Sequence, residues 1–377
     1  MNHIAFIIPT LDRIGGAERQ VIMLANGLRQ HGWRVSVVTL SGTGGDAATD
    51  LIAAGVSFLS LEMRKGLADS HGWFRFNRWL RSESPDILHA HLPHAAWLAR
   101  WSRLAAPVRV VVDTLHSSST GSIGRQLGYR FSDWLTDEVT AVSRAVADTH
   151  LAAFMASRIA VLPNGVCVET RRSDPALRAA LRHELSVNQE FLWLTAGRLD
   201  PVKNYPTLLS AIAQLPQQAR LVIAGSGPLQ TELLALSTNL GLESRIRFLG
   251  FKQDVRKWMH AADAFVLSSR WEGLPMALLE AAACALPAVA TDVPGTREVV
   301  VHGQTGWLAP AGDASALATA MIAMMEWPVE QRSAMGERAR QYVVDHFGLD
   351  AVLDRWETLY RDLLQRSPAP RRRGHAR

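Results

Sequence analysis

Short apolar runs alternate with longer amphipathic stretches along almost the whole chain. Seven strand-like runs come first and five follow: 3–9, 34–40, 56–61, 86–92, 108–116, 138–143 and 158–163, then 191–199, 219–225, 245–250, 264–269 and 287–292. Stretches with helical periodicity, such as Ala17 to Gln30, separate most of them. This alternation predicts parallel sheets covered by helices on both faces. The two series therefore predict two doubly wound α/β domains.

A polar segment separates the two series. Residues 167–189 include Pro175 and no strand pattern, so we expect a first domain at 1–168 and a second at 169–345. A final helix is expected at 346–366, followed by a basic, disordered tail at 367–377. The length of 377 residues, 48% of them hydrophobic, is enough for two cores.

Composition narrows the cellular setting and the partners. The two cysteines are far apart in sequence and have no metal-ligand spacing, which is typical of a reducing compartment, so a cytoplasmic location is expected. No apolar run is long enough for a signal peptide or a membrane span. The net charge of +5 favours anionic partners. No nucleic-acid-binding signature is present, whereas a phosphorylated small molecule or an anionic membrane surface would both account for the charge.

Residues that follow the predicted strands are candidates for ligand binding, because doubly wound sheets bind ligands at the carboxyl ends of their strands. Gly15 and Gly16 follow the first strand, where they either form a simple turn or let backbone amides reach an anionic oxygen. Arg198 ends the first strand of the second series and Lys203 comes five residues later. Together with Gly225 after the next strand, this pair of cations suits a diphosphate.

The stretch "RWEGLPMALLE" sets Glu272 and Glu280 eight residues apart around a predicted helix start. Pro275 suits the first helical position, which leaves Leu274 as a cap without a side-chain acceptor. The backbone amides there could face a phosphate or a sugar hydroxyl: Gly273, Leu274 and Met276. A hydrolase pair of carboxylates is not excluded, but the spacing better suits one acid at each end of an extended ligand such as a nucleotide sugar.

Histidines gather in the first half of the chain. His89 and His91 lie at the end of one predicted strand, and His116 ends the next, followed by three serines. Their spacing does not supply a zinc site, and no D-x-D pair for a metal-bound diphosphate occurs. Packing in the core is the common role of such a histidine, but His116 is well placed to offer hydrogen bonds to a hydroxylated ligand.

Taken in order, these motifs resemble glycosyltransferase family 4, whose members are retaining nucleotide-sugar enzymes of GT-B fold. The resemblance covers nearly the whole chain and rests on these segments: "GGAER", "HAH", "TLH", "LPNGV", "AGRLDPVKN", "AGSGP", "FLGF", "EGLPMALLE", "VPGTREVV" and "GQTGWLAP". It implies two Rossmann-like domains facing a deep cleft that closes on the donor, and a final helix that returns to the N-terminal domain.

The resemblance also implies roles for individual residues. The amide of Gly16 would contact the distal phosphate, with Gly15 beside it in the donor site, and Arg198 and Lys203 would hold the diphosphate. Glu280 would bind the ribose. Glu272, Gly273 and Leu274 would contact the transferred sugar and its phosphate, with Gly225 nearby. The base would lie against the backbone of Phe251 and Lys252. His116 would touch the donor sugar near the reacting carbon, while Arg13 and His91 would belong to the acceptor side.

The implied activity is transfer of a hexosyl or N-acetylhexosaminyl unit from a nucleoside-diphosphate sugar to a lipid-linked or glycan hydroxyl in bacterial surface-glycan biosynthesis. UDP is favoured by family frequency, with GDP and ADP open. Neither a metal nor another cofactor is expected, and the anomeric configuration would be retained. The alternatives are a GT-B nucleotide-sugar epimerase, a hydrolase, or an inactive sugar-nucleotide-binding scaffold.

Two stretches rich in aromatic and basic residues suggest the hypothesis that the protein binds peripherally to the inner face of the cell membrane. Residues 71–82 place Trp73, Phe76, Trp79 and Leu80 on one helical arc opposite three arginines, and residues 97–104 are similar. Packing of these helices on their own sheet is the interpretation that we favour, because amphipathic helices commonly cover a sheet.

Overall fold

The structure is a computed structural model of the chain, and it describes residues 1–377 except 13, 65–68, 107, 169–174 and 368–377. Two compact units share the chain. Unit 1 comprises residues 1–165 with 350–377, and unit 2 comprises residues 166–349. The predicted tail lies almost wholly outside the described residues. No helix among the described residues is both long and apolar enough to cross a membrane.

Unit 1 contains a parallel sheet of seven strands in the order β3-β2-β1-β4-β5-β6-β7. The strands are β1 (His3–Ile8), β2 (Arg34–Thr39), β3 (Ser57–Ser60), β4 (Ile87–His91), β5 (Val110–Leu115), β6 (Glu138–Ala141) and β7 (Ala160–Val161). Every residue of β1, β4, β5 and β6 is buried. Burial on both faces explains why these strands read as continuous apolar runs rather than alternating ones. All seven strands predicted for this half are present.

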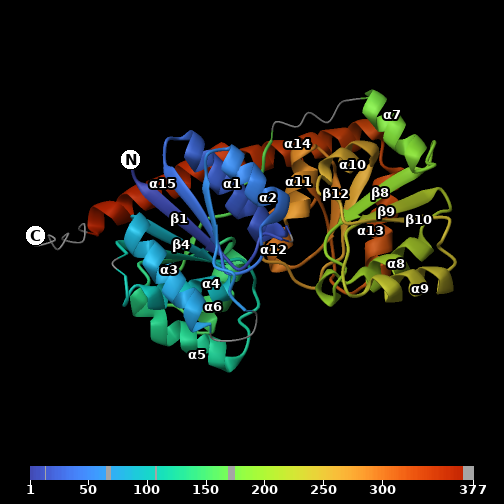
Figure 1. Cartoon of the computed structure of the whole chain (residues 1–377). Helices are drawn as coiled ribbons and strands as arrows, with labels where there is room; N and C mark the ends of the chain where they lie inside the picture. Colours follow the sequence, from blue (N-terminus) through green and yellow to red (C-terminus); the bar gives the residue numbers. More distant parts are fainter. Residues whose placement is uncertain (13, 65–68, 107, 169–174, 368–377) are drawn as a thin grey trace, which may run out of the picture. The chain divides into compact units, whose positions relative to one another are not determined.

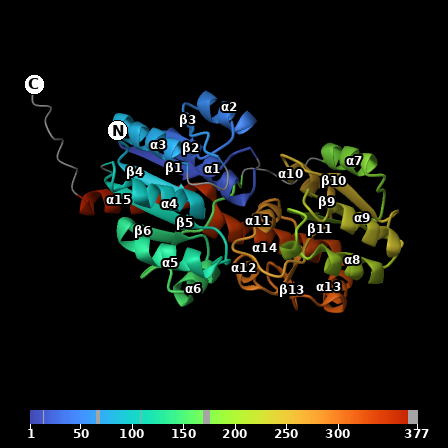
Figure 2. The same ribbon diagram turned by 60° about the horizontal axis from the view of Figure 1, so that its bottom comes forward.

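Helices cover both faces of this sheet (Figures 1 and 2). One face carries α1 (Gly16–Gln30), α2 (Gly45–Ala53) and the final helix α15 (Leu349–Arg366). The other carries α3 (Ser70–Glu83), α4 (Pro93–Ser102), α5 (Ile123–Ser132) with the 3₁₀ turn η1 (Asp133–Leu135), and α6 (Arg144–Ala152). Gly27 lets α15 approach α1, because a Cβ at that position would lie 2.4 Å from Leu353. Thus α15 is an integral part of unit 1.

Unit 2 contains a parallel sheet of six strands in the order β10-β9-β8-β11-β12-β13. The strands are β8 (Phe191–Ala196), β9 (Ala219–Ala224), β10 (Ile246–Gly250), β11 (Ala264–Leu267), β12 (Ala288–Thr291) and β13 (Gly306–Ala309). The sequence predicted the first five and missed β13. That strand has four residues and opens on Gly306, where a Cβ would lie only 2.7 Å from the carbonyl oxygen of Ala288. Glycine is required there by close packing, although its presence weakens the strand pattern.

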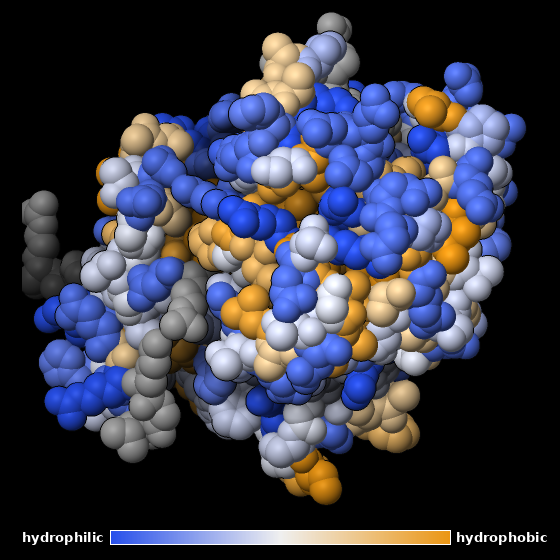
Figure 3. All heavy atoms as spheres, turned by 90° about the vertical axis from the view of Figure 1, so that its right-hand side faces the viewer, coloured by the Kyte–Doolittle hydropathy of each residue, from blue (hydrophilic) through white to orange (hydrophobic). Residues whose placement is uncertain are grey.

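The helices of unit 2 complete a second doubly wound domain. They are α7 (Pro175–Glu184), the 3₁₀ turn η2 (Pro201–Lys203), α8 (Tyr205–Gln214), α9 (Gln230–Asn239), α10 (Arg256–Ala261), α11 (Met276–Ala283), α12 (Pro294–Arg297), α13 (Ala314–Glu326) and α14 (Val329–Phe347). Trp193 and Leu221 of the sheet pack with Leu208 of α8 and Met321 of α13 in one core. Figure 3 shows hydrophilic residues distributed over one side of this unit, with apolar residues between them.

The chain enters and leaves unit 2 at one place. The N–H of Val166 donates to the carbonyl of Phe347 (2.9 Å), and the N–H of Leu349 donates to the carbonyl of Val166 (3.1 Å). In each sheet the strand order also reverses once, between β1 and β4 in unit 1 and between β8 and β11 in unit 2. Ligands of doubly wound sheets bind at such switch points, outside the carboxyl ends of the strands. The loops after β8 and β11 are therefore the first place to look for a site in unit 2.

Candidate active site

The loops after β8 and β11 are joined by hydrogen bonds that hold Lys203 in place. Asp200 caps η2 by accepting from the amides of Val202 (3.1 Å) and Lys203 (3.3 Å). The hydroxyl of Ser268, directly after β11, donates to the Lys203 carbonyl (2.8 Å), and the Arg270 amide donates to the Val202 carbonyl (2.8 Å). The switch point of the unit 2 sheet is thus a rigid backbone frame for the side chains that follow.

A buried carboxylate and an ammonium meet on this frame. Nζ of Lys203 lies 2.6 Å from Oε1 of Glu272, and the hydroxyl of Ser269 donates to the same oxygen at 2.5 Å. The side chains of Lys203 and Glu272 are 20% and 9% exposed. A charge-assisted contact so little exposed to water is strong and orients both groups. Sequence reasoning missed Ser269, whose only signal is its place three residues before Glu272.

Arg198 lies at the same strand end but in a different environment. Its side chain is 71% exposed, and its Nε is 3.7 Å from Oδ2 of Asp200. The two predicted cations are therefore both at the carboxyl end of β8. Lys203 is held in an ion pair, whereas Arg198 reaches into solvent, where its planar fork is accessible to an anionic ligand.

Glycines let the loops after β8 and β9 cross closely. Gly225 has φ of +154°, and a Cβ there would lie 1.9 Å from the carbonyl oxygen of Gly197. The Gly197 amide donates to the Ala224 carbonyl (3.0 Å), and the Gly225 amide donates to the Gly250 carbonyl (2.8 Å). Gly225 thus has a packing reason to be glycine, whatever its predicted role at a phosphate.

The helix after Glu272 begins one residue later than predicted. α11 starts at Met276, and Pro275 rather than Leu274 is its N-cap. The cap still lacks a side-chain acceptor, because proline replaces leucine in that position. Gly295 of α12 packs against this loop, since a Cβ there would lie 2.5 Å from the Glu272 carbonyl oxygen. Gly273 and Leu274 are buried in this turn.

Glu280 lies inside α11 and is 6% exposed. It contributes to the field at Arg256 of α10, a residue that sequence reasoning did not single out. Burial lowers the pKa of Arg256, but the carboxylates of Asp254 and, more weakly, Glu280 outweigh it and raise that pKa above its ordinary value. The second carboxylate of the predicted pair therefore lies close enough to Arg256 to stabilise its positive charge.

Phe251 and Lys252 follow β10, the edge strand of the sheet. Phe251 is 57% exposed, and Nζ of Lys252 lies 5.7 Å from the ring centre of Trp258. The hydrogen bond from Gly225 to Gly250 joins their loop to the one after β9. Unit 2 therefore carries all of its predicted site residues except Glu280 on loops at the carboxyl edge of the sheet.

In unit 1, two predicted histidines contact each other. His91 ends β4 and is fully buried, and its Nδ1 lies 2.8 Å from Nε2 of His116, just after β5. Burial lowers the pKa of His116 to about 4, and burial with the rings of His89 and His116 holds the pKa of His91 well below its ordinary value. Both rings are neutral near pH 7, so one must donate and the other accept.

The buried Nε2 of His91 indicates which ring donates. This atom has no hydrogen-bond partner among the described residues. A buried N–H without an acceptor costs more than a bare lone pair, so the proton of His91 belongs on Nδ1, from which it is donated to His116. His116 then carries its own proton on Nδ1. His91 contacts His116 and no solvent, so its predicted acceptor-side role would be exerted through His116.

His89 and the glycine pair have other partners. His89 is fully buried, with Nδ1 2.7 Å from the hydroxyl of Tyr360 and Nε2 2.7 Å from Oγ1 of Thr114, so it belongs to the core. Gly16 begins α1. The amide of Gly15 donates to Oε2 of Glu18 at 3.0 Å, and burial raises the pKa of Glu18. The Gly15 amide is thus occupied by an internal carboxylate. Arg13 lies outside the described residues.

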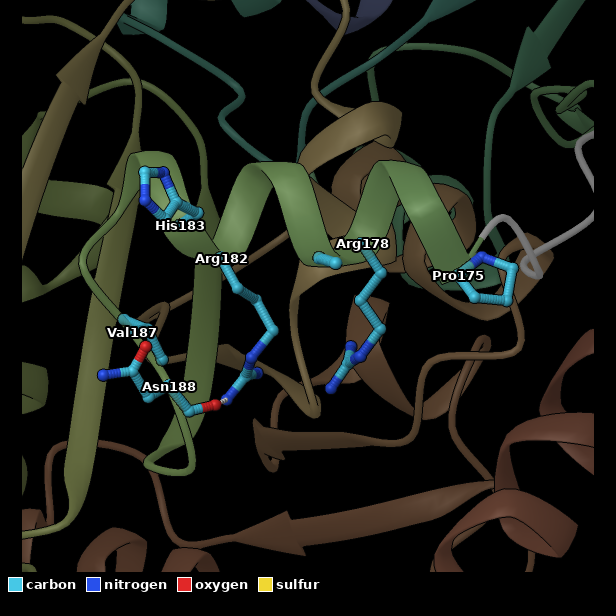
Figure 4. Close-up of a pocket in the computed structure, with 7 residues that line it drawn as sticks. Pro175, Arg178, Arg182, His183, Val187 and Asn188 are labelled. Atoms are coloured by element: carbon cyan, nitrogen blue, oxygen red, sulfur yellow. Dashed lines mark hydrogen bonds between the residues drawn. The ribbon is translucent and has the colours of Figure 1, made fainter.

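A surface hollow beside α7 is lined by Arg178, Arg182 and His183 (Figure 4). Its arginines are structural, because both pair with Asp263, at 2.6 and 3.1 Å. Asp263 precedes β11 and accepts from the amide of Leu192 at the start of β8 (2.8 Å). The hollow therefore lies at the amino ends of these strands, opposite Lys203 and Glu272.

Among the described residues, no group of three or more His, Cys, Asp or Glu side chains could hold a metal ion. The unit 2 site itself offers two cations, backbone amides and two carboxylates. These groups can bind a phosphate and hydroxyl groups together.

Solved structures with the same architecture define the class of this fold. HepE from Anabaena, crystallised with UDP and glucose, superposes with a TM-score of 0.84 at 23% identity, covering 96% of this chain and 100% of that one. The two parallel-sheet domains are those of the GT-B fold, as predicted.

Sequence comparison gives the family. Residues 14–170 match the family Glycosyltransferase Family 4, and residues 178–342 match Glycosyl transferases group 1. N-acetyl-alpha-D-glucosaminyl L-malate synthase of Bacillus anthracis is 31% identical, with 75% of this chain and 76% of that protein covered. Phosphatidyl-myo-inositol mannosyltransferase of Mycobacterium leprae is 30% identical, with 90% of this chain and 92% of that protein covered. The chain belongs to glycosyltransferase family 4, which confirms the resemblance.

Proposed function

We propose that this glycosyltransferase moves a hexosyl or N-acetylhexosaminyl unit from a nucleoside-diphosphate sugar to a hydroxyl of a lipid-linked or glycan acceptor in bacterial surface-glycan biosynthesis. The observation that carries the proposal is the Lys203–Glu272 pair at the switch point, with Arg198 at the same strand end. The UDP and glucose held by HepE support UDP as the nucleotide. The phosphatidyl-myo-inositol named for the mycobacterial relative supports a lipid-linked acceptor.

In this proposal the donor extends along the carboxyl edge of the unit 2 sheet. Arg198 and Lys203 hold the diphosphate, because a mobile ammonium and a planar guanidinium complement its oxygens. Lys203 then shares its contact between the phosphate and Glu272. Glu272 accepts from hydroxyls of the transferred sugar, beside the amides of Gly273 and Leu274.

The nucleoside end of the donor uses the remaining predicted residues. Glu280 accepts from the ribose hydroxyls, and the base lies against the backbone of Phe251 and Lys252. The Gly16 amide, at the start of α1, would contact the distal phosphate, and the Gly15 amide would join it by exchanging Glu18 for the ligand. That exchange replaces one anionic acceptor with another, so the amide stays satisfied in both states.

This arrangement accounts for each bond formed and broken in the transfer reaction. The acceptor oxygen forms a bond to the anomeric carbon on the face from which the leaving group departs, so the anomeric configuration is retained. The bond from that carbon to the phosphate oxygen breaks, and its electron pair leaves with the nucleoside diphosphate. The departing phosphate takes the acceptor proton. Arg198 and Lys203 stabilise the growing negative charge, so no metal ion is required. His116 donates from Nδ1 to a sugar hydroxyl near the reacting carbon.

The experiment is a thermal-shift screen with UDP, GDP, ADP and their sugars, followed by incubation of the best donor with lipid-linked and glycan acceptors in EDTA. A ligand that binds the native state raises its melting temperature, so UDP-sugars should give the largest shifts. NMR of the product should show the anomeric configuration of the donor. Free sugar as the only product would indicate a hydrolase. Isomerised nucleotide sugar without acceptor would indicate an epimerase, and binding without turnover a scaffold.

A further inference from the structure

Unit 1 exposes a group of large apolar side chains on one side. Six of the fifteen large apolar residues exposed in the described part of the chain lie on α4, α5 and η1, with exposed fractions from 40% to 75%. We call them the apolar helix face: Trp97, Trp101, Ile123, Leu127, Phe131 and Trp134. Single exposed apolar residues are ordinary, but a concentrated set marks an interaction site.

The six side chains belong to neighbouring elements. Ile123, Leu127 and Phe131 follow each other at four-residue spacing, which puts them along one side of α5. Trp97 of α4 packs over Gly128 of α5, where a Cβ would lie 2.5 Å from the indole. Figure 2 shows α4 and α5 side by side, and a hydrogen bond from Arg100 to the Tyr129 carbonyl (3.0 Å) joins them, while Arg103 at the end of α4 donates to the Leu135 carbonyl of η1 (3.3 Å). Residue numbers increase in the same direction along α4 and along the segments that it contacts, so α4 and α5 run parallel to each other.

The inward sides of both helices are already filled by other contacts. The guanidinium of Arg100 is fully buried, lies 2.5 Å from Oδ2 of Asp113, and donates to Oγ of Ser132 at 2.9 Å. Tyr129, on the opposite side of α5 from the apolar stripe, is 1% exposed. The exposed parts of these apolar side chains are therefore not covered by the core of unit 1, although Trp97 also packs over Gly128.

The charges around the apolar helix face are mainly positive. Between residues 93 and 135, which span the face, the sequence has five arginines and two acidic residues: Asp113, which is buried against Arg100, and Asp133 of η1. α5 carries Arg125 and Arg130, the latter 3.9 Å from Asp133 of η1. On the adjoining α3, Arg81 donates to the Ala105 carbonyl at 2.6 Å, which places this cation beside the end of α4. Anionic headgroups complement such a surround.

We propose that the apolar helix face lies in the interface of an anionic lipid bilayer, with its arginines at the headgroups. Tryptophan and phenylalanine are favoured at that depth, and an amphipathic helix lying in the interface gains from apolar burial and from anionic lipid together. This surface differs from the one predicted on α3, where Phe76 and Leu80 are 0% and 2% exposed and pack inward. The predicted stretch at 97–104 does contribute, through Trp97 and Trp101.

The test is flotation of the full chain with vesicles of phosphatidylcholine alone and of phosphatidylcholine mixed with phosphatidylglycerol. The chain should float with the anionic vesicles, and added salt should weaken binding. Phe131→Ser/Trp134→Ser and, independently, Ile123→Ser/Leu127→Ser should each lower the partition coefficient at least about tenfold, because each removes two side chains that would be buried in lipid. Leu234→Ser/Val329→Ser, which alters two exposed apolar residues of unit 2, is the matched control and should bind as the wild type does.

Two further measurements test whether the apolar helix face contacts lipid and whether its arginines contribute to binding. Brominated lipids should quench tryptophan fluorescence of the wild type more than that of Phe131→Ser/Trp134→Ser. Arg125→Gln/Arg130→Gln should weaken binding to anionic vesicles about fivefold per arginine, the factor equivalent to about 1 kcal/mol. Absence of flotation, or equal flotation by wild type and both serine variants, would overturn the proposal. So would lipid-free dimerisation that the serine variants abolish, because the face would then be covered by a second copy. None of these readouts depends on the transfer reaction.

Discussion

Nζ of Lys203 and Oε1 of Glu272 lie 2.6 Å apart, although 69 positions separate the two residues in the sequence. The pair spans the switch point of the unit 2 sheet, since Lys203 follows β8 and Glu272 follows β11. Each group holds the other's charge in place before any ligand binds. A diphosphate that binds beside Lys203 meets a cation whose position is already fixed, which reduces the entropy lost on binding.

The pair can be separated into a structural and a functional contribution. Lys203→Met should lower transfer by about 100-fold or more, because it removes a cation beside the leaving diphosphate. It should also lower the free energy of unfolding by about 1–3 kcal/mol, because Glu272 loses its charged partner. Lys203→Met/Glu272→Gln should recover most of that stability, since the buried charge is gone, yet stay inactive. Urea denaturation and initial transfer rates measure the two effects. An active double variant would contradict the assignment.

Glu280 should act on the nucleoside and not on the sugar. Glu280→Gln keeps the shape of the side chain but removes the carboxylate that we propose accepts from ribose hydroxyls. We expect the affinity for UDP to fall about tenfold or more, with a similar loss for UDP-sugar, because a hydrogen bond to a charged group contributes about 1.5–3 kcal/mol. Calorimetric titration measures both. Glu330→Gln, at an exposed position on α14, is the control. Equal affinities of all three proteins would remove Glu280 from the site.

His91 should set the tautomer of His116. In the wild type, ¹⁵N NMR of the imidazoles at pH 7.5 should show His116 protonated on Nδ1 and bare at Nε2. His91→Phe removes the donor, so His116 should populate both tautomers and kcat should fall about tenfold, which is less than the roughly 100-fold or more that a positioned proton-transfer group contributes. His91→Asn, whose amide can still donate, should restore part of the rate. A wild-type spectrum with His116 protonated on Nε2 would refute the direction of the hydrogen bond.

His116 should make the stability of the folded chain depend on pH. Unfolded His116 takes up a proton below about pH 6.5, whereas the folded chain resists until about pH 4. The unfolded state thus binds more protons in this window, and the free energy of unfolding falls as the pH is lowered through it. The loss from His116 is at most on the order of 3 kcal/mol, and less because the ring is partly exposed. His116→Gln should show a shallower decline in urea midpoint between pH 7 and pH 4.5. An unchanged decline would show that His116 is not the group that titrates.

Gly225 should tolerate no side chain. Alanine there would place a Cβ 1.9 Å from the Gly197 carbonyl oxygen at a φ of +154°. Gly225→Ala should therefore lower the free energy of unfolding by about 2 kcal/mol or more, which a marked fall in melting temperature would show. Gly241→Ala has a positive φ of +65° but nothing within 4 Å, so it should cost only the backbone strain of about 1 kcal/mol. Equal costs for the two variants would contradict the close crossing of the loops.

The sequence predicted the strands well, because buried parallel strands are long apolar runs bounded by glycine, proline or charge. β13 escaped because a four-residue strand that opens on Gly306 has no such run. The site residues of unit 2 were predicted as ligand contacts, but the Lys203–Glu272 pair was not. Its formation depends on how two loops 69 residues apart are joined, through Ser268 and Val202, and no local pattern encodes that.

In unit 1, the burial of individual side chains altered the roles predicted from the sequence. Spacing placed His91 and His116 at neighbouring strand ends, but only packing shows that His91 is enclosed and contacts His116. The arc of α3 illustrates the converse case. Its aromatic and basic pattern suits a membrane surface equally well, and the burial of Phe76 and Leu80 shows that it faces the sheet. Amphipathicity gives the apolar side of a helix but not what covers it.

The most direct test of the central claim is calorimetric titration of UDP in EDTA against the wild type and the Lys203→Met/Glu272→Gln variant, at matched folded fractions. We predict saturable one-to-one binding by the wild type without divalent ions, and affinity at least about tenfold lower in the variant, because Lys203 supplies a charged contact to the diphosphate. Undiminished UDP affinity in a folded double variant would contradict the assignment of this pair to the donor site.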